Sequence, residues 1–374
     1  MMYRILHFAD LHLDASFASA GMTPSVARQR RGDLRTALKR LINKAKELGV
    51  SAITIGGDLY EYERVSSDTI NFLKAQFESI APILVIIAPG NHDPYLPGSP
   101  YRQIEWSSNV FIFSTPELSP HEISSEITLW GAAHDSPSFR VNLFERFKVP
   151  RSGIQIILLH ASDITRVPAG KDAHCPFTPK QIAQSGAKFS LFGHYHRALL
   201  EPALKPLYSY PGSPEPLGFD EEGTHYALLA EVVDEHVSAE LIPVNAVEYR
   251  KMDIDISNAL SVEDVKQAIR VKSIEGKLSN SFVRVLLKGD LHPDVEIDIE
   301  AIVRDCHELF RFLDVEDYSC PAYDLDDIKQ EATVRGAFVR KMVDRLSICE
   351  VEEDKRIVQQ SIIYGLRALD GREI

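Results

Sequence analysis

The sequence predicts an α/β protein with a parallel sheet, followed by a small α+β domain and terminal helices. Its clearest segment is the aliphatic run at 82–88, which ends at Pro89-Gly90 and has the composition of a strand buried on both faces. Similar runs at 3–10 and 51–58 are separated by a segment with helical periodicity, which is the order of a right-handed βαβ unit. The pattern changes near 243–250, where we expect a second domain to begin.

The elements of the first 245 residues follow from periodicity and turn residues. Apolar side chains at helical spacing predict a helix over 27–48, which Gly49 ends, and another over 66–80. Farther along we expect strands of a second sheet at 109–113 and 127–132, a short helix at 139–147, a strand at 154–160, a helix near 180–185, a strand at 189–196, and a hairpin of 226–233 with 236–243.

The remaining residues predict an α+β domain and two further helices. The pattern gives a strand at 252–256, a helix at 262–271, a strand at 282–288, a helix at 299–312, and helices at about 325–346 and 353–369. We expect three parts, with the bounds 1–245, 246–322 and 323–374. The last helix carries an apolar stripe, which is typical of core packing and would also suit docking to another protein. The stripe consists of Ile357, Ile362, Ile363 and Leu366.

The composition is that of an ordinary globular protein, with 44% hydrophobic and 25% charged residues among 374. No apolar run reaches the roughly 20 residues of a membrane helix, and the N-terminus turns polar too early for a signal peptide. The four cysteines form no C-x-x-C pair, which predicts reduced thiols and no zinc ribbon. We therefore expect a cytoplasmic protein without membrane contact.

The net charge of −13 makes most of the surface a poor binder of nucleic acid. If the protein acts on nucleic acid, local basic patches or a partner must supply the attraction. The densest basic cluster lies in the first turns of the predicted helix 27–48 and includes Arg28, Arg30, Arg31 and Arg35. This cluster could face phosphate, with Arg30 and Arg31 as candidate substrate-binding residues, or it could form a solvated face balanced by acids elsewhere.

Five predicted strand ends each deliver side chains that can bind a metal ion. The first strand ends in two of them, Asp10 and His12, which face the same way because they are two positions apart. Because the carboxyl ends of parallel strands share one edge of a sheet, we expect all these side chains to meet. The full set is Asp10, His12, Asp58, Asn91, His160, His194 and His196.

These oxygen and nitrogen donors include no thiolate, and they suit Mn²⁺, Fe²⁺ or Zn²⁺ better than Ca²⁺ or Mg²⁺. Seven ligands are too many for one tetrahedral ion and suit two, with a carboxylate such as Asp58 shared at the ~3.5–4 Å of two-metal sites. Two such ions favour in-line displacement at phosphorus. His92 is placed to protonate the leaving oxygen, and Asp93 would either orient His92 or cap a turn.

Taken in order, these segments resemble the five motifs of the calcineurin-like metallophosphoesterases over about residues 3–245. The matching segments are Asp10-x-His12, Gly57-Asp58, Gly90-Asn91-His92-Asp93, His160 and Gly193-His194-x-His196. The resemblance implies a four-layer α/β/β/α sandwich that holds two metal ions, with His92 as the acid. It implies one ion on Asp10, His12, Asp58 and His196, and the other on Asp58, Asn91, His160 and His194.

Within that superfamily the sequence is most similar to the Mre11/SbcD-type DNA repair exonuclease branch. The similarity lies in Ile-Leu-His-Phe-Ala-Asp-Leu-His-Leu near the start, the Arg28–Arg31 cluster, Gly-Gly-Asp-Leu-Tyr at 56–60, and Tyr-Pro-Gly-Ser at 210–213 followed by Phe219-Asp220-Glu221. Leu11 and Asp14 stand where the bacterial SbcD pattern has Trp and Gly, and the sequence is closer to the YhaO-type relatives.

The resemblance to this branch implies a Mn²⁺-dependent 3′–5′ DNA exonuclease, with endonuclease activity as a second mode. It also implies a capping domain that guides DNA, terminal helices that dock an SMC/Rad50-like ATPase, and a homodimer as one assembly.

Two other functions stay open on the residues alone. A phosphoesterase for nucleotides or other small phosphate esters would fit the acidic surface. A partner-binding scaffold with a residual metal site would be expected to have lost at least one ligand, and none is missing.

Overall fold

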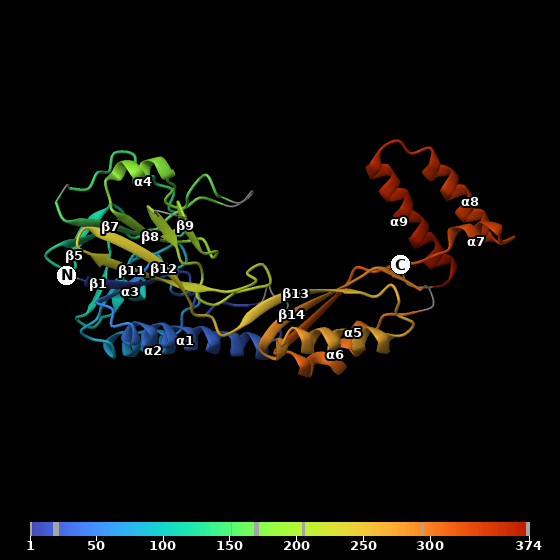
Figure 1. Ribbon diagram of the computed structural model, residues 1–374, viewed down its shortest axis with the longest axis horizontal. Coiled ribbons are helices and arrows are strands. Elements are labelled where there is room, and N and C mark those ends of the chain that lie inside the picture. Colours follow the sequence, from blue (N-terminus) through green and yellow to red (C-terminus); the bar gives the residue numbers. More distant parts are fainter. Residues whose placement is uncertain are drawn as a thin grey trace. The chain divides into compact units, whose positions relative to one another are not determined.

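The computed structural model describes residues 2–17, 22–150, 152–167, 172–203, 206–292 and 295–371. The chain divides into two compact units, Met1–Tyr249 and Arg250–Ile374. The division falls inside strand β13 (Glu248–Asp255). Figure 1 labels many of the elements of both units.

The first unit contains two six-stranded sheets. One sheet has the order β12 (His236–Pro243), β11 (Tyr226–Val233), β1 (Met2–Phe8), β2 (Ala52–Ile55), β3 (Leu84–Ile87) and β4 (Val110–Ile112). Strands β1 to β4 are parallel to one another, which confirms the βαβ prediction for β1, β2 and β3. The predicted hairpin of β11 and β12 is confirmed, and β11 runs antiparallel to β1.

The second sheet has the order β5 (Ser119–Glu122), β6 (Ile127–Gly131), β7 (Ile154–His160), β8 (Phe189–Gly193), β10 (Tyr208–Tyr210) and β9 (Leu199–Glu201). Its four central strands are parallel, and the short edge strands β5 and β9 are antiparallel to their neighbours. Strands β7 and β8 both end at the same edge, which places His160 opposite Gly193.

Helices cover the outer faces of the two sheets. Figure 1 shows α1 (Pro24–Glu47) and α2 (Ser67–Glu78) on one side of the sheets and α4 (Pro179–Ser185) on the other, so the unit has the layers α/β/β/α. A short helix, α3 (Pro100–Gln103), follows β3. Helix α1 begins where the Thr23 hydroxyl accepts from the Val26 N–H, and it ends before Gly49, whose φ of +58° favours glycine.

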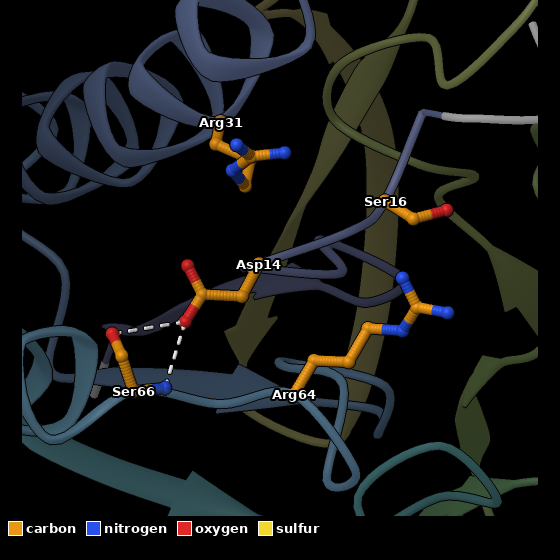
Figure 2. Close-up of a pocket in the computed structure, with 5 residues that line it drawn as sticks. All are labelled: Asp14, Ser16, Arg31, Arg64 and Ser66. Carbon is orange, nitrogen blue, oxygen red and sulfur yellow. Dashed lines mark hydrogen bonds between the residues drawn. The ribbon is translucent and has the colours of Figure 1, made fainter. Parts of the chain in front are cut away.

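The start of α2 is held by a side chain from the loop after β1. The Oδ2 atom of Asp14 accepts a hydrogen bond from the Ser66 N–H at 2.9 Å (Figure 2) and another from the Thr69 hydroxyl at 2.7 Å. Ser66 is itself the N-cap of α2 and accepts from the Thr69 N–H. The Asp14 carboxylate therefore lies at the positive end of this helix.

The core between the two sheets follows the alternation of side chains along each strand. Ile5, Ala52 and Ile86 of the first sheet pack with Ile156 and Leu158 of the second in one buried cluster. The intervening residues of β7, Ile157 and Leu159, face the other way and pack with Ile182 of α4. Both faces of β7 are thus buried, which explains its continuous apolar sequence.

One buried histidine lies between the sheets. The Nε2 atom of His7 is 3.2 Å from the Phe192 carbonyl oxygen, and Nδ1 is 3.0 Å from the Thr54 hydroxyl. Because the carbonyl can only accept, the neutral tautomer with the proton on Nε2 satisfies both bonds. Burial lowers the pKa of His7 to about 4.

Two predicted elements of this unit are wrong. Strand β4 was expected in the second sheet, but it pairs parallel to β3 in the first. Periodicity shows that a segment is a strand and does not identify its partner. The helix expected over 139–147 is absent, because the Asn142 side chain accepts from the Phe144 N–H at 2.9 Å and forms a local turn in place of a helical bond.

The second unit contains a three-stranded sheet in the order β13, β14 (Ser281–Lys288) and β16 (Phe312–Asp317), and a short pair of β15 (Asp290–Leu291) with β17 (Cys320–Pro321). The helices of this part are α5 (Val262–Glu275), α6 (Ile299–Cys306) and two 3₁₀ turns, Leu278–Asn280 and His307–Leu309. The predicted helix over 299–312 is therefore too long, since α6 ends at Cys306, and β16 was missed. Leu313 and Val315 of β16 are buried at a spacing of two, which is a strand pattern.

The terminal helices are α7 (Leu325–Gln330), α8 (Val334–Ser347) and α9 (Glu352–Leu369). The helix predicted over 325–346 is broken in two, because the Thr333 hydroxyl accepts from the Gly336 N–H at 3.1 Å and starts α8. Ile362 and Leu366 of the predicted stripe are buried in a small core with α7 and α8, which confirms core packing for these two. Ile357 is 52% exposed.

In the part of the chain that the structure describes, no helix is both long enough and apolar enough to cross a membrane. All four cysteines are free thiols. Cys175 and Cys306 are buried, Cys349 is half-buried and Cys320 is exposed.

His7 should make stability depend on pH. The unfolded chain protonates this histidine below its ordinary pKa of 6.5, whereas the folded chain does so only near pH 4, so the unfolded state binds one more proton in that window. We expect the free energy of unfolding to fall as pH drops from 7 to 5.5, with His7 contributing about 1 kcal/mol of the loss. Urea unfolding at both pH values, in the presence of a metal chelator, measures this difference in free energy.

The control for this prediction is the exposed His236. His7→Gln should show a smaller loss of stability between the two pH values than the wild type, whereas His236→Gln should show the same loss. An unchanged pH dependence in His7→Gln would mean that the buried histidine does not resist protonation.

Candidate metal centre

The carboxyl ends of the two sheets of the first unit meet at one place. His160, the last residue of β7, donates through Nδ1 to the Gly56 carbonyl oxygen after β2, at 2.7 Å. The backbone N–H of His194, after β8, lies 3.1 and 3.0 Å from the two carboxylate oxygens of Asp10, after β1. These contacts join the strand ends of one sheet to those of the other.

Glycines permit this close approach. A Cβ on Gly57 would lie 2.6 Å from Nδ1 of His160 and 2.8 Å from the Cα of Gly90, and the φ of Gly57 is +90°. A Cβ on Gly90 would overlap Oδ1 of Asp58. Any larger residue at these positions would push the strand ends apart.

Four predicted site residues have a left-handed backbone, with φ of 55° at Asp10, 49° at His12, 52° at Asp58 and 108° at His194. Such angles cost a non-glycine residue on the order of 1–3 kcal/mol and persist where the surroundings enforce them. Here the His12 N–H donates to the Asp58 carbonyl at 3.0 Å, which ties two strained loops together. Strain concentrated at converging strand ends is typical of a functional site.

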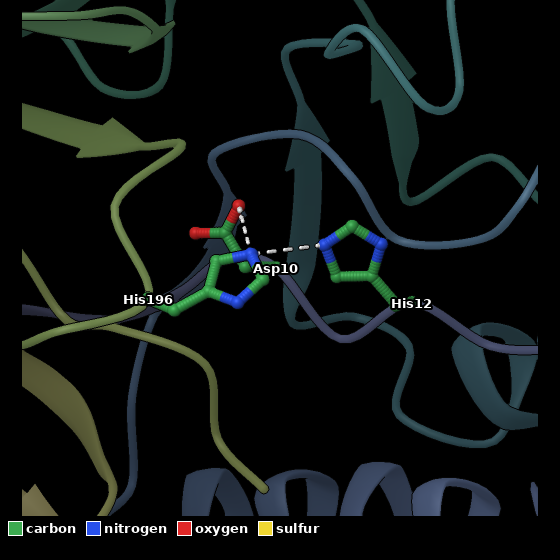
Figure 3. Close-up of side chains that lie close together, drawn as sticks. All are labelled: Asp10, His12 and His196. Atoms are coloured by element: carbon green, nitrogen blue, oxygen red, sulfur yellow. Dashed lines mark hydrogen bonds and ion pairs between the residues drawn. The ribbon is translucent and has the colours of Figure 1, made fainter. Parts of the chain in front are cut away.

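One group of possible ligands consists of Asp10, His12 and His196 (Figure 3). Nε2 of His12 lies 3.2 Å from Nε2 of His196, which is 4.0 Å from Oδ1 of Asp10. The other nitrogen of each ring is held by a carboxylate. Nδ1 of His12 lies 2.7 Å from Glu61, and Nδ1 of His196 lies 2.6 Å from Glu221.

A second group surrounds His160. Its Nε2 atom lies 3.2 Å from Oδ2 of Asp58, 2.9 Å from Oδ1 of Asn91 and 3.2 Å from Nδ1 of His194. The same Oδ2 atom of Asp58 is 3.8 Å from Nε2 of His12, which belongs to the first group. Asp58 therefore contacts both groups, and all seven predicted ligands lie in one site.

The atoms that face the centre of this site are mostly hydrogen-bond acceptors. Because Nδ1 of His160 donates to a carbonyl, Nε2 faces the oxygens of Asp58 and Asn91, as a donor when the ring is protonated and as a possible metal ligand when it is neutral. A proton or a metal ion must lie between these atoms, because their lone pairs would otherwise repel one another. These side chains therefore fit divalent metal ions, and the two groups that share Asp58 fit two neighbouring ions.

Glu61 and Glu221 are site residues that the sequence analysis missed. Glu61 contacts two histidines, with Oε1 at 2.7 Å from His12 and Oε2 at 2.9 Å from His92. Glu221 accepts from the Ser213 hydroxyl and holds His196. Such carboxylates fix the orientation and tautomer of metal-binding histidines. Glu61 lies three residues after Asp58 in the same loop, which is a weak signal; Glu221 was noted only as part of a matching segment.

His92 lies at the rim of the site with 45% of its side chain exposed. Its backbone N–H donates to Oδ1 of Asp58 at 2.8 Å, and its ring packs edge-on against His12 at a centroid distance of 4.8 Å. The hydrogen bond from Nδ1 to Glu61 raises the pKa of His92 to about 9.

Asp93 takes the second of its two predicted roles, that of a turn residue. Oδ1 accepts from the backbone N–H groups of Asp58 at 2.9 Å and Gly90 at 2.6 Å, and Oδ2 accepts from the Leu59 N–H at 2.8 Å. Asp93 thus fixes the loops that carry Asp58 and Asn91. Glu61, rather than Asp93, orients the ring of His92.

The charges of the centre depend on one another. Burial raises the pKa of Asp10, whereas for Asp58 the nearby His160 and His12 outweigh burial and hold the pKa well below its usual range. Asp58 in turn outweighs the burial of His160 and raises its pKa to about 9. Burial and His160 lower the pKa of His194 to about 2. Metal binding would therefore release a proton from His160.

The structure separates the two candidate substrate-binding arginines. Arg30 is fully buried, and its guanidinium donates to Asp33 at 2.7 Å and to the Pro216 carbonyl at 2.8 Å. The prediction that Arg30 binds substrate is therefore wrong, because its side chain has no exposed surface. Arg31 is half-buried and lines a pocket with Asp14, Ser16, Arg64 and Ser66.

Comparison with known proteins gives a family and three relatives. The model of the calcineurin-like phosphoesterase family matches residues 3–198. The uncharacterized metallophosphoesterase YhaO of Bacillus subtilis (strain 168) is 27% identical in an alignment of length 294, which covers 76% of this chain and 71% of YhaO.

Two other relatives are named DNA double-strand break repair protein Mre11. The protein of Aeropyrum pernix is 24% identical in an alignment of length 319, which covers 77% of this chain and 74% of the relative. The protein of Methanopyrus kandleri is 24% identical in an alignment of length 285, which covers 70% of this chain and 59% of the relative.

The family match covers more than half of the chain and includes every residue of the candidate centre except Glu221. The two-sheet fold and the relatives agree with the resemblance inferred from the motifs. This chain therefore belongs to the calcineurin-like phosphoesterase family and is a metal-dependent phosphoesterase.

Proposed function

We propose that this phosphoesterase cleaves the phosphodiester bonds of DNA as a Mn²⁺-dependent 3′–5′ exonuclease, with endonuclease activity as a second mode. The observation that carries the proposal is the convergence of five strand ends on a buried, acceptor-rich centre with His92 at its exposed rim. The names of the two Mre11 relatives support DNA as the substrate.

We assign the ligands by the two groups that the distances define. One ion is held by Asp10, His12, Asp58 and His196, and the other by Asp58, Asn91, His160 and His194. Asp58 is shared because one oxygen lies near a histidine of each group. A set of oxygen and imidazole ligands without thiolate favours Mn²⁺, with Fe²⁺ or Zn²⁺ as alternatives.

When bound, two divalent ions neutralise the phosphate and lower the pKa of a water that can attack phosphorus. The chain's own contribution is to place the ligands and to supply a proton. Glu61 accepts from Nδ1 of His92, which leaves Nε2 as the nitrogen that can protonate the leaving oxygen. The exposure of His92 lets a bound strand reach it.

We further propose that 1–245 is the nuclease domain, that 246–322 is a cap that guides DNA, and that 323–374 docks an SMC/Rad50-like ATPase. The exposed apolar residues Ile357 and Tyr364 on α9, which are 52% and 48% exposed, support a docking role for that helix. A homodimer is the assembly proposed for the nuclease. Pull-down of such an ATPase by the wild type and not by Ile357→Asp tests the docking role.

Nuclease assays with the purified full chain test the proposed function. We expect Mn²⁺ to support release of nucleotides from the 3′ end of DNA, with weaker activity in Mg²⁺ or Zn²⁺, because the nitrogen ligands disfavour Mg²⁺. Bis(p-nitrophenyl) phosphate, run alongside, reports phosphodiesterase activity without DNA. Hydrolysis of this compound with no cleavage of DNA in any metal would exclude the nuclease.

The net charge of −13 favours a second candidate, a phosphoesterase for nucleotides or other small phosphate esters. Most of an acidic surface repels DNA and does not repel a small ester to the same degree. Activity on cyclic nucleotides or nitrophenyl phosphates that exceeds activity on DNA would support this candidate.

His92→Ala should lower the rate of DNA cleavage by about 10²–10⁴-fold, the usual contribution of a general acid. The loss on bis(p-nitrophenyl) phosphate should be much smaller, because p-nitrophenolate leaves without being protonated. Initial rates on both substrates at saturating Mn²⁺ measure the two losses. Equal losses would show that His92 acts on the metal site and not as an acid, and His236→Ala should change neither rate.

Asp58→Asn should remove most of the bound metal, because one oxygen contacts both ligand groups. We expect bound Mn²⁺ to fall from two ions per chain to fewer than one, whereas His196→Ala should retain about one. Metal content after gel filtration, measured by atomic emission, distinguishes these results. Two ions in Asp58→Asn would contradict the shared-ligand assignment.

A further inference from the structure

A pocket of about 490 Å³ opens next to the loops of the candidate centre and is lined by Asp14, Ser16, Arg31, Arg64 and Ser66 (Figure 2). We propose that this pocket binds a second phosphate of the substrate strand through Arg31 and Arg64, and that it thereby selects polynucleotides over single phosphodiesters. The inference rests on the proposed cleavage of DNA and adds a specificity site to it.

The two loops that carry the centre supply four of the five residues that line the pocket, and helix α1 supplies Arg31. Asp14 follows His12 by two residues, a span of at most ~7 Å, and Arg64 follows Glu61 by three. The backbone N–H of Arg64 donates to the Glu61 carbonyl at 2.9 Å, so this segment is a tight turn. Both walls of the pocket therefore move with the residues that orient His12 and His92.

Two further hydrogen bonds hold these loops side by side. The Leu13 N–H donates to the Leu59 carbonyl at 3.0 Å, and the Glu61 N–H donates to the Leu13 carbonyl at 3.0 Å. The backbone that carries Arg64 is thus held in place relative to the residues of the centre.

The pocket contains positive charge that the protein does not neutralise. The other arginines of α1 between 30 and 40 have carboxylate partners, in the pairs Arg30–Asp33, Arg35–Asp68 and Arg40–Glu215. Within the described ranges, neither Arg31 nor Arg64 has a carboxylate within ion-pair distance. Two guanidinium groups that line one pocket without such partners favour an anion there.

The carboxylate in the pocket is compensated from another side. Oδ2 of Asp14 accepts three hydrogen bonds at the start of α2, from the Ser66 N–H at 2.9 Å, the Ser66 hydroxyl at 3.2 Å and the Thr69 hydroxyl at 2.7 Å. Figure 2 shows this carboxylate turned toward Ser66, with the guanidinium of Arg64 on its other side. Asp14 thus positions α2, and the arginines dominate the charge of the pocket.

Phosphate is the anion that suits this arrangement. Guanidinium groups bind phosphate oxygens with paired, charge-assisted hydrogen bonds. A nucleic-acid strand carries a phosphate on each nucleotide, so one phosphate in the centre places others nearby, whereas a single phosphodiester has none to offer. The pocket would therefore lower the KM for strands in particular.

The test compares the full-length wild type with a variant that carries both Arg31→Ala and Arg64→Ala, in Mn²⁺. The double variant should lose at least tenfold more kcat/KM on a single-stranded oligonucleotide than on bis(p-nitrophenyl) phosphate. The additional loss on the oligonucleotide should come from a higher KM. The slope of log kcat/KM against log salt on the oligonucleotide should become shallower by ~0.7, because the double variant loses one phosphate contact.

The matched control is Lys46→Ala, which removes one positive charge from the exposed far end of the same helix, about 22 Å from Arg31. This control should retain wild-type values on both substrates. If Lys46→Ala lost as much kcat/KM on the oligonucleotide as the double variant does, the loss would be a general charge effect, and the proposed phosphate site would be overturned. Equal losses of kcat/KM by the double variant on both substrates would also overturn the proposed site.

A second measurement separates failure of the pocket from failure of the proposed function. If the wild type hydrolyses bis(p-nitrophenyl) phosphate but not the oligonucleotide, the nuclease is excluded. The oligonucleotide is then used as an inhibitor of bis(p-nitrophenyl) phosphate hydrolysis. An inhibition constant at least tenfold weaker in the double variant supports the phosphate site, and an unchanged constant overturns it.

Discussion

Mutual repulsion among buried electron pairs is the constraint on which the first unit depends. Asp10, Asp58 and His160 are buried at the meeting point of two sheets, and the atoms they turn toward one another would repel without a proton or a metal ion between them. An uncompensated charge in a protein interior costs several kcal/mol, so this arrangement needs cations. Two features let these side chains come so close. Asp10 and Asp58 adopt strained backbone angles, and Gly57 and Gly90 have no Cβ atom that would clash. The packing of the strand ends therefore creates both the fold and the need for bound cations.

The loop after β2 connects the parts of the site. Asp58 contacts both ligand groups, and Glu61, three residues later in the same loop, holds His12 and His92. Asp93 fixes this loop by accepting from the Asp58 and Leu59 N–H groups. A displacement of the loop would move a metal ligand and the proposed acid together. The placement of the ligands and of the proposed acid thus depends on one segment, and the fully buried Asp93 contributes by holding that segment in place.

The sequence was sufficient to identify the ligands at the strand ends and insufficient to identify the carboxylate that orients the histidines. Asp10, Asp58 and His160 follow apolar runs, and the rule that parallel strands end at one edge brings them together without any knowledge of the packing. Glu61 has no such mark, because its role arises only when His12 and His92 lie on either side of it.

Arg30 shows the opposite failure. Its helix position looked exposed, and only the packing of the Pro216 segment against α1 buries it. Sheet membership of β4 and the turn at Asn142 were likewise set by tertiary or side-chain contacts.

The pattern of paired and unpaired charges also depends on tertiary packing. Arg30 and Arg31 are adjacent in sequence, yet one is paired inside the protein and the other faces a pocket. In a chain of net charge −13, attraction for a polyanion must come from cations that the fold leaves without carboxylate partners. Because Arg31 and Arg64 line a pocket beside the centre, they would favour a strand that reaches the centre over one bound elsewhere. The proposed nuclease would in this way combine weak general affinity for DNA with selective use of a DNA end.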